Sequence, residues 1–122
     1  MPSCDFLHVQ AYDGIVLAKV AKERLLDAAA INSLGEGLNQ LLDRYPKISL
    51  VLDLSEVGYL SSAVLGKLVA LHKQVKTLKG RMALAGMKPA ILPLFKVTNL
   101  DKVFEIHAEA QLALIAYRKK PL

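Results

Sequence analysis

The chain has 122 residues, of which 53% are hydrophobic and 22% charged, and its formal net charge is +5 at neutral pH. This length and balance are typical of one folded domain with a buried core, and they exclude a disordered or fibrous protein. No segment approaches the roughly 18 consecutive apolar residues of a membrane span, and no secretory leader pattern opens the chain. We therefore expect a soluble, cytoplasmic, single domain over residues 1–122, with its core at residues 6–117.

The positive charge does not predict nucleic-acid binding. Basic residues are scattered along the chain, and the only tight run is residues 118–120. Nucleic-acid-binding proteins usually gather basic side chains on one face, together with aromatic side chains for stacking. Here tryptophan is absent and aromatic residues make up 6% of the chain. The single cysteine, Cys4, supports neither an internal disulfide nor a cysteine metal site, so we expect no metal and no cofactor.

The first elements expected along the chain are two strands and a helix. Apolar runs on either side of Asp13-Gly14 predict a β-hairpin, because Asp-Gly is a favoured two-residue turn. Asp27 then suits the N-cap of a helix that Pro46 ends. Apolar residues between them recur three and four positions apart and predict one buried stripe, made of Ile31, Leu34, Leu38, Leu41, Leu42 and Tyr45.

A buried strand and a second helix are expected next. Residues 48–54 are short and largely apolar, which is typical of a central strand buried on both faces. The pair Ser61-Ser62 then opens a helix whose apolar stripe ends before Gly80. We expect Gly80 to take the left-handed conformation common at helix C-termini.

The remaining segments complete the predicted sheet. Residues 81–86 predict a fourth strand, residues 102–106 an edge strand and residues 109–119 a closing helix. Pro89 suits the first turn of a short third helix, whereas Pro93 fits poorly inside it. Strands that alternate with helices after an opening hairpin predict an α/β fold: a mixed sheet of about five strands, with about four helices mainly on one face.

The order of these elements, and the phrases VLDLSEVGYLSSAVLGK, GRMALAG and KVTNLDKVFEI, resemble the STAS domain of bacterial anti-sigma factor antagonists. The resemblance spans nearly the whole chain and implies the STAS fold. In that family a D-S-S-G or D-S-T-G signature opens a helix, and its first serine is phosphorylated. The resemblance places this phosphoserine on Ser61, with Ser62 as the alternative, and the family's conserved acid on Asp27. Leu60 stands where the signature usually has Asp, and Ala63 where it usually has Gly.

The resemblance implies partner exchange. The unmodified domain would bind an anti-sigma factor and release a sigma factor, and the anti-sigma factor is often a serine kinase that phosphorylates its antagonist. A PP2C-like phosphatase would reverse the modification. The implied partner-binding residues are Asp27, Leu60, Ser61, Ser62, Ala63 and Val64. We expect a monomer or a weak dimer, and we expect Ser61 to be exposed enough for a kinase.

Two other interpretations of the serine pair remain open. Ser61 can be an ordinary helix N-cap and Ser62 an ordinary first-turn residue, which would leave an unphosphorylated interaction scaffold or a module that senses a small ligand or nucleotide. A catalytic pair of Ser61 and His72 is excluded, because eleven residues along one helix separate them by about 16 Å. No phosphate-binding glycine loop or G-x-S-x-G motif occurs either, so we expect no enzymatic activity.

Overall fold

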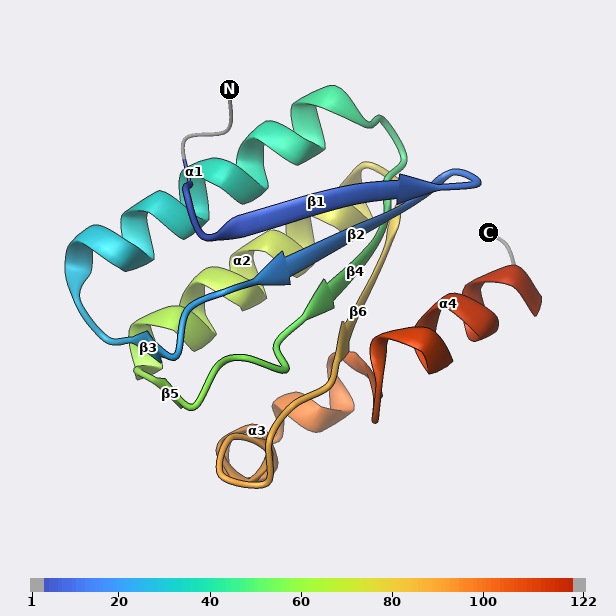
Figure 1. The fold of residues 1–122 in the computed structure, drawn as a ribbon. Coiled ribbons are helices and arrows are strands. Elements are labelled where there is room, and N and C mark those ends of the chain that lie inside the picture. The colour runs from blue at the N-terminus through green and yellow to red at the C-terminus, as the bar shows by residue number, and fades with distance from the viewer. Residues whose placement is uncertain (1–3, 120–122) are drawn as a thin grey trace.

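A five-stranded mixed sheet organises the chain, which is described here over residues 4–119 in a computed structural model (Figure 1). The spatial order of the strands is β1-β2-β4-β6-β7. β1 and β2 are antiparallel, and every other neighbouring pair is parallel. This confirms the predicted α/β fold with a mixed sheet opened by a hairpin. The strands are β1 (Leu7–Tyr12), β2 (Ile15–Val20), β4 (Ser49–Asp53), β6 (Arg81–Ala85) and β7 (Glu105–His107).

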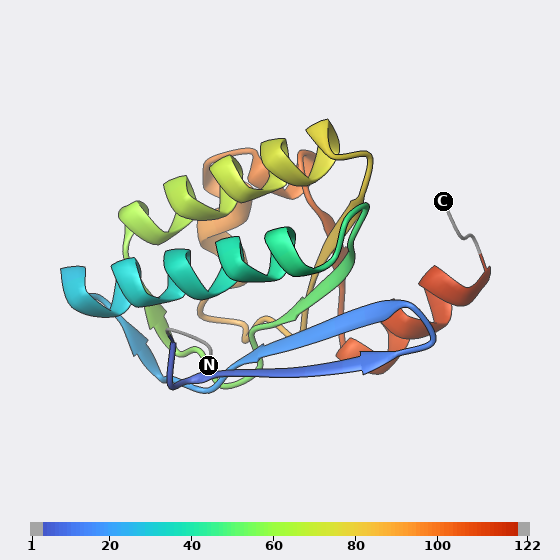
Figure 2. The same ribbon diagram turned by 90° about the horizontal axis from the view of Figure 1, so that it is seen from above.

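Three of the helices share one core and the fourth packs on the opposite face of the sheet. Figure 2 shows α1 and α2 side by side on one side of the sheet, away from α4. β4 is buried on both faces: Leu50 and Leu52 contribute to the core beneath α1 and α2, while Val51 contributes to the core beneath α4. None of the helices in residues 4–119 is long and apolar enough to cross a membrane. The helices are α1 (Ala28–Arg44), α2 (Ser62–Thr77), α3 (Leu92–Val97) and α4 (Ala110–Lys119).

Local sequence signals account for the hairpin and the start of α1. Asp13 and Gly14 both have positive φ, +47° and +82°, which the tight turn between paired antiparallel strands requires. The Asp27 carboxylate accepts a hydrogen bond from the amide of Ala30 at 2.7 Å, so Asp27 is the N-cap of α1 as predicted.

The end of α2 differs from the prediction. Lys79, not Gly80, adopts the left-handed conformation, with φ +62°. The amide of Gly80 donates a hydrogen bond to the carbonyl of Val75 at 2.8 Å, and the amide of Lys79 donates one to the carbonyl of Lys76 at 3.0 Å. These two hydrogen bonds form a Schellman motif at the helix C-terminus. Glycine is needed at position 80 for a different reason, because a Cβ there would lie 2.5 Å from the carbonyl oxygen of Ile48.

Two further boundaries were predicted wrongly. Pro89 lies before α3, and it is Pro93 that occupies the first turn, where a missing backbone N–H breaks no intrahelical hydrogen bond. The edge strand predicted at residues 102–106 is shorter and later, because a 3₁₀ turn, η1 (Leu100–Lys102), takes up its start.

A second, two-stranded sheet was not predicted. β3 (Arg24–Leu25) and β5 (Tyr59–Leu60) pair in parallel beside the main sheet. Two-residue strands are too short to show an alternating pattern in the sequence. Their pairing depends on where the flanking elements bring them.

Gly80→Ala tests the close approach at the end of α2. We expect the free energy of unfolding to fall by about 1–3 kcal/mol, because the added methyl overlaps the backbone at Ile48. The matched control is Gly66→Ala in the same helix, where nothing lies within 4 Å of the added Cβ. Alanine favours helix over glycine by about 1 kcal/mol, so this variant should be more stable. Urea unfolding followed by circular dichroism measures both, and equal effects would contradict the packing explanation.

Candidate functional site

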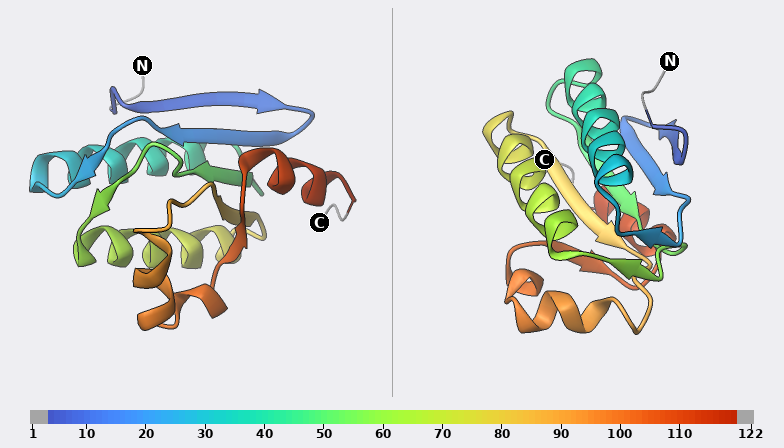
Figure 3. Two further views of the ribbon diagram at one scale, coloured as in Figure 1. Left: turned by 60° about the horizontal axis from the view of Figure 1, so that its bottom comes forward. Right: turned by 90° about the vertical axis from the view of Figure 1, so that its left-hand side faces the viewer.

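The pairing of β3 with β5 brings the N-termini of α1 and α2 to the same end of the molecule (Figure 3). Leu25 lies opposite Leu60, and the amide of Ser61 donates to the carbonyl of Leu25 at 3.2 Å. Each strand runs almost directly into its helix, which begins at Ala28 in one case and Ser62 in the other. The predicted acid, Asp27, and the serine pair are therefore neighbours in the fold.

The hydroxyl of Ser61 is buried and has no hydrogen-bond partner among the described residues. Ser61 is the N-cap of α2 by its backbone, since its carbonyl accepts from the amide of Val64 at 3.0 Å, but its side chain does not cap the helix. Asp27 does cap its own helix. The expectation that the Ser61 hydroxyl is exposed is thus wrong for this conformation, and the N-cap interpretation accounts only for its backbone.

The other predicted partner-binding residues divide into exposed and buried. Ser62 and Ala63 are exposed on the first turn of α2. Leu60 is only 8% exposed and Val64 only 1%, and both belong to the core beneath α1 and α2. Burying apolar side chains in the core is energetically favourable, so Leu60 and Val64 present little surface for a partner to contact. We therefore drop Leu60 and Val64 from the candidate contact surface; they hold the serine pair in position.

Two exposed apolar side chains flank the site and were missed from the sequence. Leu26, 42% exposed, precedes Asp27, and Tyr59, 51% exposed, precedes Leu60. The Arg24 guanidinium lies 4.7 Å from the centroid of the Tyr59 ring. Leu26 follows the end of β3 and Tyr59 opens the two-residue β5, so no periodic pattern in the sequence marks either side chain as exposed.

Within residues 4–119 no group of three or more His, Cys, Asp or Glu side chains could hold a metal ion. His72 packs edge-on against Phe104 with ring centroids 5.1 Å apart. Burial, together with the charge of Lys76, lowers the pKa of His72. His72 therefore has a packing role on the far part of α2, consistent with its predicted separation from Ser61.

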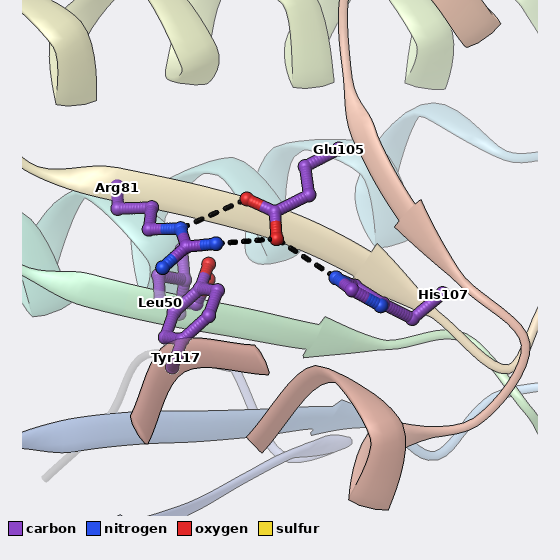
Figure 4. Close-up of polar contacts among 5 residues, drawn as sticks. All are labelled: Leu50, Arg81, Glu105, His107 and Tyr117. Atoms are coloured by element: carbon purple, nitrogen blue, oxygen red, sulfur yellow. Dashed lines mark hydrogen bonds and ion pairs between the residues drawn. The ribbon is translucent and has the colours of Figure 1, made fainter. Parts of the chain in front are cut away.

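A dense polar cluster lies instead where β6, β7 and α4 meet (Figure 4). Arg81 donates twice to the Glu105 carboxylate, at 2.9 and 2.7 Å, and His107 Nε2 lies 2.8 Å from the same group. The Arg81 guanidinium also lies 4.1 Å from the centroid of the Tyr117 ring, whose hydroxyl donates to the carbonyl of Leu50 at 2.6 Å. These contacts attach α4 to the sheet.

The pKa of Glu105 reflects this pairing. Burial alone would raise it, but the hydrogen bonds from Arg81 and His107 outweigh burial and hold the pKa below its ordinary value. Burial raises the pKa of Tyr117, so its hydroxyl stays a hydrogen-bond donor at neutral pH. The ion pair of Arg81 with Glu105 therefore has a structural role.

Comparison with known proteins identifies the fold. The family model of the STAS domain matches residues 7–113. The chain is 24% identical over 112 residues to BtrV of Bordetella bronchiseptica, named as a candidate anti-sigma factor antagonist, with 92% of this chain and 94% of that protein covered. It is similar to the crystal structure of an anti-sigma factor antagonist from Mycobacterium paratuberculosis, with 26% identity, a TM-score of 0.82 and 97% of each chain covered.

A more distant likeness concerns the fold alone. The anti-sigma factor antagonist SpoIIAA in its unphosphorylated form is 9% identical, with a TM-score of 0.68, and the alignment covers 95% of this chain and 99% of that one. SpoIIAA of Bacillus has also been solved in a phosphorylated form, which matches with a TM-score of 0.69 at 12% identity over 90% of this chain and 97% of that one.

Substituting the two helix caps tests the burial of the Ser61 hydroxyl. Because that hydroxyl makes no hydrogen bond, Ser61→Ala should leave the free energy of unfolding unchanged or raise it. Asp27→Ala removes a side chain that does cap its helix and should lower stability by about 1 kcal/mol. Urea unfolding of both variants beside the wild type makes the comparison. A similar loss from Ser61→Ala would show that its hydroxyl caps α2 in solution.

Glu105→Gln tests the ion pair at α4 through its pH dependence. The lowered pKa means that ionised Glu105 stabilises the fold above its unfolded-state pKa, near 4.5, and that this contribution disappears as the pH falls through the lower folded-state pKa. At pH 7 the variant should be less stable by about 1–3 kcal/mol, and the difference should shrink below pH 4.5. Glu56→Gln, in the exposed pair with Lys19, is the control and should change little at any pH. A pH-independent difference for Glu105→Gln would exclude this account.

Proposed function

The chain belongs to the STAS domain family, and on that basis we propose that it is an anti-sigma factor antagonist switched by serine phosphorylation. In its unmodified form it binds an anti-sigma factor and so releases a sigma factor for transcription. Two relatives named as antagonists, at 24% and 26% identity and each covered over most of its length, support this proposal. The chain is the substrate of the switch and not its enzyme.

The observation that carries the proposal is the difference in exposure between the two serines at the start of α2. Ser62 is exposed, and Ser61 holds the helix start while its own hydroxyl is buried. Accessibility therefore favours Ser62 as the phosphate acceptor, in place of Ser61, which the sequence resemblance favoured. Ser61 remains the alternative, because turning its hydroxyl outward breaks no hydrogen bond among the described residues.

The position of the pair lets a phosphate be added without unfolding the domain. The first amides of a helix have no intrahelical acceptor, and the helix dipole favours negative charge at this end. A phosphoserine adds a charge of about −1.5 to −2 and three acceptor oxygens. At the first turn of a 16-residue helix, both effects stabilise the modified state.

The same phosphate weakens partner binding. The surface that a partner would cover contains the apolar side chains of Leu26 and Tyr59, the methyl of Ala63 and the carboxylate of Asp27. A phosphate buried in such a contact loses its hydration and lies near an existing negative charge. Each 1.4 kcal/mol lost is about tenfold in affinity, so a penalty of a few kcal/mol releases the partner.

The partners follow from this switch. The anti-sigma factor is proposed to be the serine kinase that phosphorylates this chain, and a PP2C-like phosphatase to restore the unmodified form. The contact surface comprises Asp27, Ser62 and Ala63 together with Leu26 and Tyr59.

A second candidate function is a constitutive binding module, either a scaffold or a sensor of a small ligand or nucleotide. Two observations favour it. Leu60 replaces the acid of the family signature and is buried in the core, and the Ser61 hydroxyl is inaccessible in this conformation. In that case the serine pair has only the structural role of starting α2.

Peptide mass spectrometry of protein isolated from its native cell distinguishes these functions, with Ser61→Ala and Ser62→Ala expressed in its place. We expect a phosphate on Ser62 that Ser62→Ala abolishes and Ser61→Ala retains. A phosphate that only Ser61→Ala abolishes would keep the switch and move it to the alternative serine. No phosphate in any growth phase, with both variants regulating as the wild type does, would favour the constitutive module.

A binding measurement then tests the switch itself. The protein co-purified with Ser62→Ala is identified by mass spectrometry, and its affinity is measured for wild type and Ser62→Asp. We expect that protein to phosphorylate the wild type with ATP, and Ser62→Asp to bind it at least about tenfold more weakly. A partner without kinase activity, or one that binds Ser62→Asp as tightly, would contradict the proposed cycle.

A further inference from the structure

A basic hollow of about 570 Å³ lies at the end of the sheet opposite the serine pair. It is bounded by the starts of β2, β4 and β6, by the hairpin turn and by the last turn of α4, which lie toward the right of Figure 1. Among the described residues, four basic side chains from three segments of the chain line it: Lys47, Lys79 with Arg81, and Arg118. The hydroxyl-bearing Ser49 lies among them.

The positive charges of this basic hollow exceed the negative ones. Arg81 is paired with Glu105, and Arg118 lies 3.5 Å from the Asp13 carboxylate. Lys47 and Lys79 form no ion pair with any residue in the described range 4–119. Within that range, two ammonium groups therefore remain without an ion-pair partner in one concave surface, and such a surface attracts anions.

The backbone conformation at the two lysines bears on why lysine occurs there. Lys47 and Lys79 have φ of +55° and +62°, a left-handed conformation that favours glycine or asparagine. In residues 4–119, four residues other than glycine have positive φ, and three of them, Asp13, Lys47 and Lys79, line this hollow. The hairpin turn accounts for Asp13 and the Schellman ending of α2 accounts for Lys79, so what needs an explanation is the presence of lysine, and not the turn itself.

Local structure does not explain the choice of lysine. A basic residue near a helix C-terminus complements the helix dipole, but the last turns of α1 and α2 already carry Arg44 and Lys76. Glycine would form both turns at lower conformational cost. What lysine adds at positions 47 and 79 is its charged amine.

We propose that this basic hollow binds a small molecule that carries a phosphate group, with Lys47 and Lys79 as its direct contacts. Ammonium groups bind phosphate as point charges, and the flanking Arg81 and Arg118 extend the positive field. The volume falls in the range of small-molecule sites and exceeds what a phosphate ion alone would fill. The site is separate from the serine pair and does not depend on the function proposed above.

The test is an NMR titration of the full chain with inorganic pyrophosphate at constant ionic strength. We expect saturable shifts of the backbone amides of Gly14, Lys47, Lys79 and Arg81. The double variant Lys47→Gly/Lys79→Gly should bind pyrophosphate at least about tenfold more weakly. Its melting temperature should rise, because glycine adopts both turns without strain. The matched control, Lys96→Gln on the exposed surface of α3, removes a charge outside the hollow and should leave the affinity unchanged.

Four results would overturn the proposal. The first is the absence of saturable shifts, and the second is an equal response to sulfate, which would indicate only general attraction of anions. The third is tighter binding of citrate, which would make the ligand a polycarboxylate. The fourth is unchanged pyrophosphate affinity in the double variant together with its higher melting temperature, which would assign both lysines to the turns alone.

Discussion

The hydrogen bond from the Ser61 amide to the Leu25 carbonyl joins two segments that are far apart in the sequence, and the candidate site depends on it. It extends the short pairing of β3 with β5, which places the starts of α1 and α2 at one end of the sheet. Leu25 and Leu60, opposite one another, anchor this pairing in the core. The exposed residues of the site are thereby held at the starts of two helices, which suits the proposed phosphorylation because the added charge would not require unfolding.

The two ends of the sheet carry surfaces of different chemistry. The serine pair lies beyond the carboxyl end of β4, where helix N-termini favour added negative charge. The basic hollow lies at the opposite ends of the same strands. Between them, β4 is buried on both faces because α4 covers the side that α1 and α2 leave open. Ala83 and Ala85 on β6 belong to that second core, and their small side chains leave room for α4 to pack closely.

Much of the fold could be predicted from the sequence because its signals are local. The Asp13-Gly14 turn, the Asp27 cap and the apolar stripes of α1 and α2 each depend on residues a few positions apart. The failures involve contacts between distant segments. Glycine at position 80 suggested a left-handed cap, whereas the backbone of Ile48 is what requires it. Pro93 fits the first turn of α3 because the helix starts at Leu92, after Pro89, and the packing of Phe95 into the core is a long-range contact.

For the candidate site, the sequence by itself determined that a serine pair opens an amphipathic helix after a buried strand, and that Asp27 caps the other helix. Those features follow from hydrophobic periodicity and capping, which act within one or two turns. Only the tertiary structure decided that Ser62 is exposed while the Ser61 hydroxyl, Leu60 and Val64 are buried, and that Lys47 and Lys79 share one hollow. Burial and charge balance depend on what the rest of the chain packs against a residue, and no local pattern carries that information.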